Sequence, residues 1–92
     1  MLISDCLYSG SENAIKLSTL ERALKLSGRQ IRQAIHRERL HGSPIISDNV
    51  NGYYLAETEK ELIHFKESML HRATEITRIA NAVGSATIRK EK

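Results

Sequence analysis

The stretch from Ser18 to His41 constrains the fold of this chain of 92 residues more than any other. Ser27 is followed three residues later by Gln30, which is the pattern of a capping box, where each side chain bonds to the other residue's backbone N–H at a helix start. Ser18 and Glu21 have the same spacing. Only a short corner separates the two segments. The stretch therefore predicts two helices joined by a tight turn, with Ser18 and Ser27 as their capping residues.

The two predicted helices each have an apolar face, and the second also has an unusual polar face. The apolar residues at helical spacing are Leu20, Ala23 and Leu24 in the first helix, and Ile31, Ala34 and Ile35 in the second, continued less regularly by Leu40. The polar face of the second helix comprises Arg29, Gln30, Arg32, Gln33, His36 and Arg37. Arg presents a forked donor that fits the guanine edge, and Gln pairs with the adenine edge. Because the span from Gly28 to Arg37 contains three arginines and no acid, contact with nucleic acid is favoured over an ordinary solvated face.

The charge of the chain is unevenly distributed around a net value of +3. From Lys16 to Gly42, seven Lys or Arg residues stand against Glu21 and Glu38, a balance of +5. From Glu57 to Glu67, four acids stand against two lysines, a balance of −2. An anionic partner is therefore expected for the first region only.

The segments around the two helices predict smaller elements. A two-turn opening helix is expected from one stripe of apolar residues, which are Leu2, Ile3, Cys6 and Leu7. As the single cysteine, Cys6 excludes an intrachain disulfide and is expected to be a small buried apolar residue. Ile15 and Leu17 alternate with polar residues, which predicts a very short strand that pairs with the edge of a later hairpin.

A β-hairpin is predicted after the second helix. Gly42 ends that helix, as glycine commonly does just beyond a helix C-terminus. Two β-rich runs, Ile45–Ser47 and Tyr53–Leu55, follow, and Asn51 and Gly52 between them tolerate positive φ. Of the two tyrosines in the second run, one is expected in the core, and periodicity does not decide which. A hairpin in this position is a wing.

A long helix is predicted from Glu59 to Val83, after a third capping box of Thr58 and Glu61. Three acids lie at the start of this helix, namely Glu57, Glu59 and Glu61. We interpret them as residues that cap the helix and interact favourably with its dipole, and the alternative is an acidic docking surface. A helix of about 25 residues is about 37 Å long, whereas a winged domain is about 25–30 Å across. The apolar face is therefore expected to pair with a second copy of the chain through Phe65, Met69, Ala73, Ile76, Ala80 and Val83.

Other classes of protein and site are not expected. No stretch approaches the roughly 20 apolar residues of a membrane span, and no signal peptide is evident, so a soluble, reduced, cytoplasmic chain without a membrane partner is expected. His64 and His71 are about 10 Å apart along a helix, too far for two ligands of one zinc ion, and His36 and His41 lie near no cysteine or acid cluster. Neither a metal nor another cofactor is expected. No nucleophile or phosphate-loop motif occurs, so the chain is not expected to be an enzyme.

Three motifs together resemble the winged helix-turn-helix superfamily. They are Ser-Gly-Arg-Gln-Ile-Arg-Gln-Ala-Ile at residues 27–35, Gly-Ser-Pro-Ile-Ile at residues 42–46 and Gly-Tyr-Tyr-Leu at residues 52–55. Residues 1–56 are similar to the small domain at the front of the biotin-ligase repressor and of sugar-operon repressors. The chain also resembles the short winged-helix proteins encoded by phages and prophages. The expected fold is mainly α with a small β-hairpin: a winged domain at 1–56, a long helix at 57–84 and a basic tail at 85–92.

The resemblance implies a role for each part of the domain. The recognition-helix residues Arg29, Gln30, Arg32, Gln33 and His36 would face the major groove. Ser18 and Ser27, at helix N-termini, would hold phosphates, and the hairpin tip, made of Asn49, Val50 and Asn51, would lie over the adjacent minor groove or backbone. Repressors of this kind have an effector domain that is not seen after the long helix, so no small-molecule effector is expected.

Two functions are therefore considered for the chain. The first is sequence-specific binding of double-stranded DNA by a homodimer that acts as a transcriptional regulator or as a phage-type replication or regulatory accessory protein. The alternative is a winged-helix module that binds another protein and makes no direct DNA contact. The two differ in the arginines of the second helix: the alternative predicts ion pairs between them and Glu38 or the acids near Glu57.

Overall fold

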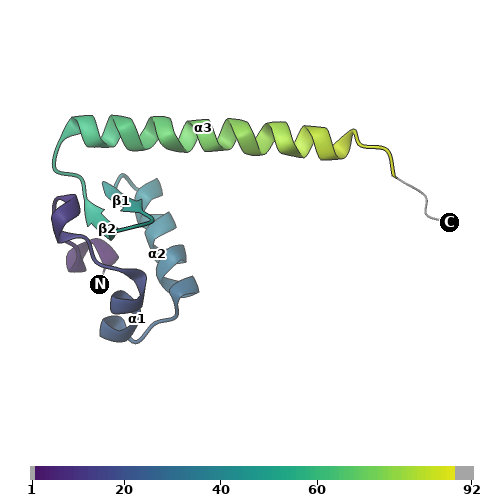
Figure 1. Ribbon diagram of the computed structural model, residues 1–92. Coiled ribbons are helices and arrows are strands. Elements are labelled where there is room, and N and C mark those ends of the chain that lie inside the picture. The colour runs from purple at the N-terminus through teal and green to yellow at the C-terminus, as the bar shows by residue number, and fades with distance from the viewer. Residues whose placement is uncertain (1, 89–92) are drawn as a thin grey trace. The chain divides into compact units, whose positions relative to one another are not determined.

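The computed structural model describes residues 2–88, which are mainly helical with one small antiparallel hairpin and a long C-terminal helix (Figure 1). In chain order the elements are two short 3₁₀ helices, η1 (Ile3–Cys6) and η2 (Ser11–Asn13), then α1 (Leu17–Leu24), α2 (Gly28–Leu40), β1 (Ile45–Asp48), β2 (Gly52–Leu55) and α3 (Glu59–Gly84). The chain divides into two compact units between Leu62 and Ile63, within α3. The order of helices and hairpin is compatible with a winged-helix topology.

The start of α1 differs from the prediction. Its N-cap is Lys16, which makes no side-chain capping bond, and Ser18 lies exposed in the first turn. The predicted capping box of Ser18 with Glu21 is therefore wrong. Leu17 packs against the core and is already helical, so the helix begins before Ser18. Packing of the partly buried Leu17 explains this start, because most of the stability of a short helix comes from tertiary packing.

The start of α2 confirms the second capping box. Ser27 Oγ accepts a hydrogen bond from the Gln30 backbone N–H at 3.1 Å, and Gln30 Oε1 accepts one from the Ser27 N–H at 2.9 Å. Lys25, which ends α1, adopts the left-handed conformation with φ of 55°. The predicted tight turn thus consists of the three residues between Leu24 and Gly28.

Serine-to-alanine substitutions at the two helix starts should have different effects on stability. Ser27→Ala removes the acceptor for the Gln30 N–H and should lower the free energy of unfolding by about 1 kcal/mol. Ser18→Ala is the matched control, because Ser18 is exposed and is not the capping residue, and should change it by less than about 0.5 kcal/mol. Urea unfolding followed by circular dichroism measures both changes. Equal effects of the two substitutions would contradict this account of the caps.

The hydrophobic core lies between α1, α2, η1 and β1. Its buried members are Ile3, Leu7, Leu20, Ile31, Ile35 and Ile45. Ala34 and Leu24 pack against this cluster as predicted, but Ala23 is exposed and Leu40 is 75% exposed, so both were wrongly placed on the apolar face. Glu38, rather than Leu40, continues the inner face of α2.

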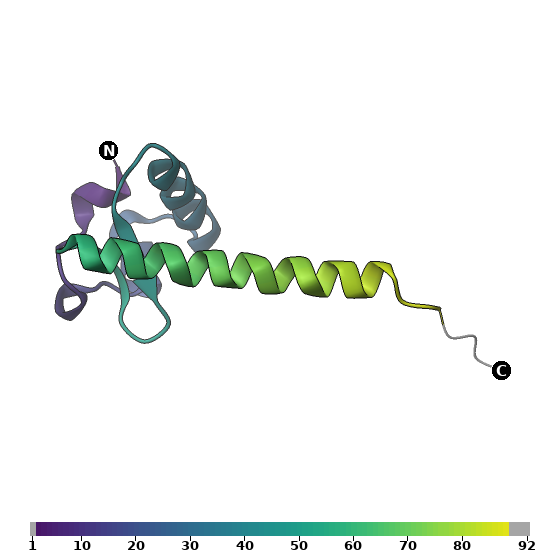
Figure 2. The same ribbon diagram turned by 90° about the horizontal axis from the view of Figure 1, so that it is seen from above.

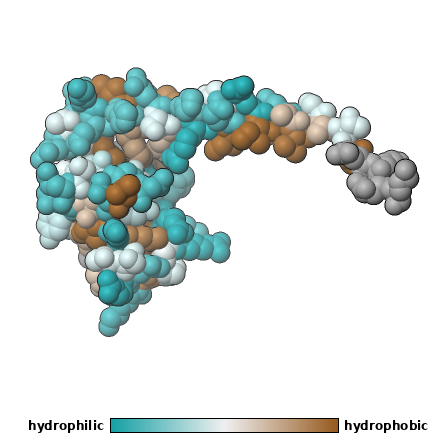
Figure 3. All heavy atoms as spheres, viewed as in Figure 1, coloured by the Kyte–Doolittle hydropathy of each residue, from teal (hydrophilic) through white to brown (hydrophobic). Residues whose placement is uncertain are grey.

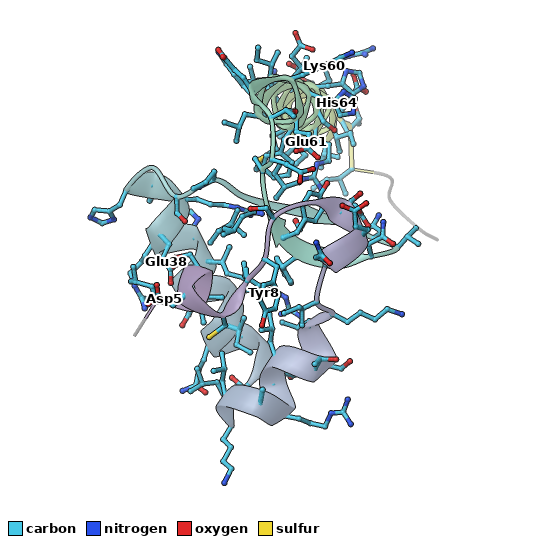
Figure 4. The ribbon with its side chains drawn as sticks, turned by 90° about the vertical axis from the view of Figure 1, so that its left-hand side faces the viewer. Asp5, Tyr8, Glu38, Lys60, Glu61 and His64 are labelled. Carbon is cyan, nitrogen blue, oxygen red and sulfur yellow. The ribbon has the colours of Figure 1, made fainter. Side chains whose placement is uncertain are left out.

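The N-terminal segment is shorter in its helical part than predicted. Instead of two helical turns it forms η1, a single 3₁₀ turn, with Ile3 and Leu7 buried and Leu2 exposed. Cys6 is partly buried and packs against the core. Glu38 of α2 lies beside η1 (Figure 4) and accepts hydrogen bonds from the backbone N–H groups of Ile3 at 2.6 Å and Ser4 at 2.9 Å. This carboxylate satisfies N–H groups that a short helix start would otherwise leave unpaired.

The predicted hairpin is present and antiparallel, with Ile45 paired to Leu55. Each strand is one residue longer than predicted, because Asp48 and Gly52, expected in the loop, pair with each other. Its loop projects from the N-terminal unit (Figure 2). Gly52 has φ of 109°, whereas Asn51 does not have the positive φ that the sequence suggested. A Cβ on Gly52 would lie 2.3 Å from the backbone oxygen of Ile15, so this position requires glycine for space as well as for conformation.

Residues that precede α1 extend the sheet. Ile15 and Tyr53 exchange two backbone hydrogen bonds of 2.8 Å, which confirms the predicted edge pairing for Ile15, although Leu17 begins α1 instead. Ser9 forms a second, parallel bridge to Leu55.

Tyr54 is the more buried of the two tyrosines, and Tyr53 is partly buried against the core cluster. The pKa of the Tyr54 hydroxyl is raised, mainly by burial and further by the negative charges of Asp48 and Glu61.

The long helix α3 starts and extends as predicted. Thr58 and Glu61 form the third capping box, with Thr58 Oγ1 accepting from the Glu61 N–H at 3.2 Å and Glu61 Oε1 accepting from the Thr58 N–H at 3.1 Å. No residue between 59 and 84 is buried, and apolar side chains gather along one side of the later turns (Figure 3). Residues 86–88 have no regular structure, and Arg89, Lys90 and Lys92 of the predicted basic tail lie outside the described residues.

Candidate nucleic-acid interface

One face of α2 presents polar and cationic side chains to solvent. The members of this recognition face, which also line one shallow depression, are Arg29, Arg32, Gln33, His36 and Arg37. All five are exposed, while Ile31 and Ile35 on the opposite side are buried in the core. The apolar side thus fixes the rotation of the helix, and the predicted polar side chains lie together on its outer face.

Gln30 differs from the other predicted recognition residues. Its Oε1 atom accepts the hydrogen bond from the Ser27 N–H in the capping box. A bidentate contact to adenine needs both the oxygen and the nitrogen of an amide. While the cap is intact, the Gln30 amide therefore has only its NH₂ group to offer, and Gln33 is the glutamine of the recognition face with both groups available.

Acids lie near the arginines of the recognition face without forming ion pairs with them in the described part of the chain. Among residues 2–88, no ion pair joins Arg29, Arg32 or Arg37 to an acid. Glu38 directly follows Arg37 in the sequence, but its carboxylate is turned inward to Ile3 and Ser4. The arginine charges therefore remain directed toward solvent.

Glu21 is the acid that approaches this face in space. The side chains of Glu21 and Arg32 both lie close to Gly28. From the position that a Cβ would take on Gly28, Glu21 Oε2 is 3.1 Å away and Arg32 Nη2 is 3.5 Å away. At this place the Glu21 carboxylate is next to the N-terminus of α2, where a negative charge is stabilised by the helix dipole. Glu21 thus acts at the start of α2 rather than at the start of its own helix.

Some of the predicted backbone-contact residues come together in a second place, and Asn51 is not among them. Ser18, at the start of α1, lines the same groove as Asn49 and Val50 of the hairpin loop, together with Lys16. Ser27 is not part of this groove and lies at the start of α2. The structure thus brings together Ser18 and the hairpin tip, although they are about thirty residues apart in the chain.

Asp48 shapes the hairpin loop from inside. Its carboxylate accepts hydrogen bonds from the backbone N–H of Val50 at 2.9 Å, from the Asn51 N–H and from Asn51 Nδ2 at 3.1 Å. The bond from the Asn51 backbone N–H is the main cause that lowers the pKa of Asp48 from its ordinary value. The carboxylate therefore orders the tip that presents Asn49 and Val50.

Sequence reasoning missed two residues that position this surface. Arg39 donates to the backbone oxygen of Ile45 at 2.9 Å and to Ser47 Oγ at 3.2 Å, so it connects α2 to β1. Glu38 holds η1 against α2, as described above. A signal for Glu38 was present, since it continues the spacing of Ile31 and Ile35 on the apolar face. For Arg39 the sequence offers no such signal, because its partners are a backbone oxygen and a serine.

The predicted dimer residues all lie along α3. Phe65 is partly buried, and the other five, which are Met69, Ala73, Ile76, Ala80 and Val83, are exposed.

Two other kinds of site were also considered for this chain. Within residues 2–88, no group of three or more His, Cys, Asp or Glu side chains is placed so that it could hold a metal ion. In the same part of the chain, no helix has the length and apolar character to cross a membrane.

No protein-family model, curated protein or solved structure matches this chain. The features of the chain that bear on its function are the recognition face, the groove beside the hairpin and the exposed side of α3.

Proposed function

We propose that this chain binds double-stranded DNA in a sequence-specific manner, with α2 in the major groove and the hairpin over the adjacent backbone or minor groove. In this proposal it acts as a homodimer through α3, as a transcriptional regulator or as a phage-type or prophage-type replication accessory protein. The resemblance of residues 1–56 to the DNA-binding domains of the biotin-ligase repressor and sugar-operon repressors supports the proposal.

The observation that carries the proposal is the set of exposed arginines on α2 that form no ion pair with an acid among residues 2–88. A guanidinium group left in solvent keeps its donors for guanine O6 and N7 or for phosphate oxygens. In the helix-turn-helix arrangement, residues near the N-terminus of the second helix contact base edges. Arg29, Arg32 and Gln33 occupy that part of α2.

The interaction-module alternative predicts that these arginines pair with acids of the chain. Instead, Glu38 bonds to backbone N–H groups, and Glu61 Oε1 bonds to the N–H groups of Glu57 and Thr58. These two acids are therefore engaged in helix starts. If the alternative were correct, a protein partner captured from lysate would survive nuclease treatment and be lost on truncation at Glu57.

DNA binding should weaken steeply as salt increases. If each protomer of a dimer neutralises about three phosphates, log K should fall with log salt with a slope of about −5. The measurement is fluorescence anisotropy of a labelled duplex at several salt concentrations, using mixed-sequence DNA and then a sequence selected from a random library. The selected duplex should bind at least about 1,000-fold more tightly than the mixed one. Absence of binding to either duplex at about 50 mM salt would refute the proposal.

A further inference from the structure

We propose that α3 pairs with α3 of a second copy in antiparallel orientation, with the two-fold axis passing between Thr74 and Glu75. This inference rests on the homodimer of the proposed function and assigns its geometry. It is argued from the exposed side of α3, from the sizes of the residues there and from the charges beside them.

The exposed side of α3 has a seven-residue repeat. Met69, Ile76 and Val83 are spaced by seven residues, and their side chains are 40%, 65% and 69% exposed. Ala73 and Ala80 form a second column with the same spacing, and both are exposed. A repeat of seven keeps one stripe of a helix facing another helix over several turns. The partner that this pattern fits is therefore a helix with the same repeat, which a second copy supplies.

The sizes of these residues distinguish the two orientations. In an antiparallel pair centred between residues 74 and 75, Ala73 faces Ile76 of the second copy and Ala80 faces Met69 of the second copy. Each layer then joins a small and a large side chain, which fills the space evenly. In a parallel pair the alanines face alanines and Ile76 faces Ile76, so narrow and crowded layers alternate. Such layers leave cavities and force side chains from their preferred rotamers.

The charged residues along α3 favour the same orientation. Lys66 continues the column of Ala73 and Ala80, so in a parallel pair in register it faces Lys66 of the second copy, and like charges repel. In the antiparallel pair, Lys66 is level with Val83 of the second copy. Arg72 lies on the same edge as Glu75 of the second copy and about 3 Å from it along the helix axis. Glu75 is bonded to Arg78 at 3.1 Å within its own helix, an exposed pair that contributes little and can be shared.

The orientation determines where the N-terminal units attach. In the antiparallel pair the two Leu62 residues are separated by about 37 Å along the helix axis, whereas in a parallel pair they are level. One turn of B-DNA between half-sites is about 34–36 Å. The antiparallel arrangement therefore separates the two attachment points by about one turn of the duplex.

Disulfide cross-linking of single-cysteine variants tests the orientation in the full chain. Met69→Cys and Ala80→Cys are made separately in a Cys6→Ala background, and each is incubated alone and as an equal mixture in a glutathione redox buffer. We expect little covalent dimer in either single sample, because identical positions lie about 16 Å apart along the axis in the antiparallel pair. The mixture should form a covalent heterodimer, which the different masses of the two variants identify in mass spectrometry.

The possible outcomes separate the orientation from the proposals on which it rests. Efficient disulfide formation in the Ala80→Cys sample alone would show parallel pairing and overturn the inference, while the homodimer would stand. A dimeric chain that forms no cross-link in any sample would also overturn it. A monomer in light scattering of the unmodified chain would remove the homodimer itself. None of these results decides whether the chain binds DNA, which is measured independently by anisotropy.

Discussion

Replacing Arg29 and Arg32 together with alanine should weaken binding to the selected duplex by at least about 100-fold, or about 2.8 kcal/mol. Each arginine that contacts a base edge with two hydrogen bonds is worth about 1–3 kcal/mol, so the double variant removes a large part of the specific affinity. Both side chains are exposed on α2 and outside the core, so the fold should persist. Fluorescence anisotropy at one fixed salt concentration measures the loss.

The matched control removes the same charge from another part of the chain. Lys60→Ala with Arg78→Ala lowers the net charge by the same amount, and both residues are exposed on α3. We expect this variant to bind within about threefold of the unmodified chain, apart from the general effect of net charge. If the control weakened binding as much as the α2 variant, the affinity would come from overall charge, and α2 would have no particular role.

Replacing Glu38 with alanine should lower the free energy of unfolding by about 3 kcal/mol. The substitution leaves the N–H groups of Ile3 and Ser4 without their acceptor, and the bond to Ile3 is buried. Hydrogen bonds to a charged group contribute about 1.5–3 kcal/mol each, and an unpaired buried donor adds a desolvation cost. Urea unfolding followed by circular dichroism measures the change.

Two further variants show whether the hydrogen bonds are the cause. Glu38→Gln keeps one acceptor oxygen and should lose about half as much stability as Glu38→Ala. Glu67→Ala removes a carboxylate from an exposed position on α3 and should change stability by less than about 0.5 kcal/mol. A Glu38→Ala protein that is as stable as the Glu67→Ala protein would show that the contact with η1 contributes nothing.

Features that depend on neighbouring residues could be predicted from the sequence. The capping boxes at Ser27 and Thr58 each involve residues within one helical turn, and both are present. The hairpin follows from a loop with a glycine between two β-rich runs, and Gly42 has positive φ at the end of α2. In each case the interaction closes over a few residues, so the local pattern contains the whole cause.

Features that depend on tertiary packing could not be predicted in the same way. Ser18 has the spacing of a cap, but packing of Leu17 against the core moves the helix start. Leu40 has an apolar side chain, but the inner position near the end of α2 is taken by Glu38, whose partners lie 35 and 34 residues earlier. For the candidate site, the exposure of the arginines was predicted correctly, whereas the groove that joins Ser18 to Asn49 depends on contacts between distant segments.

The backbone bridges from Ser9 to Leu55 and from Ile15 to Tyr53 also affect how the chain folds during translation. The first fifteen residues emerge from the ribosome without the strand that completes them. At about 5–20 residues per second, they wait roughly 2–8 s for it. Over this interval the apolar side chains of Ile3 and Leu7 have no finished core to enter, so a nascent chain stalled before Leu55 is expected to be a target for chaperones or proteases.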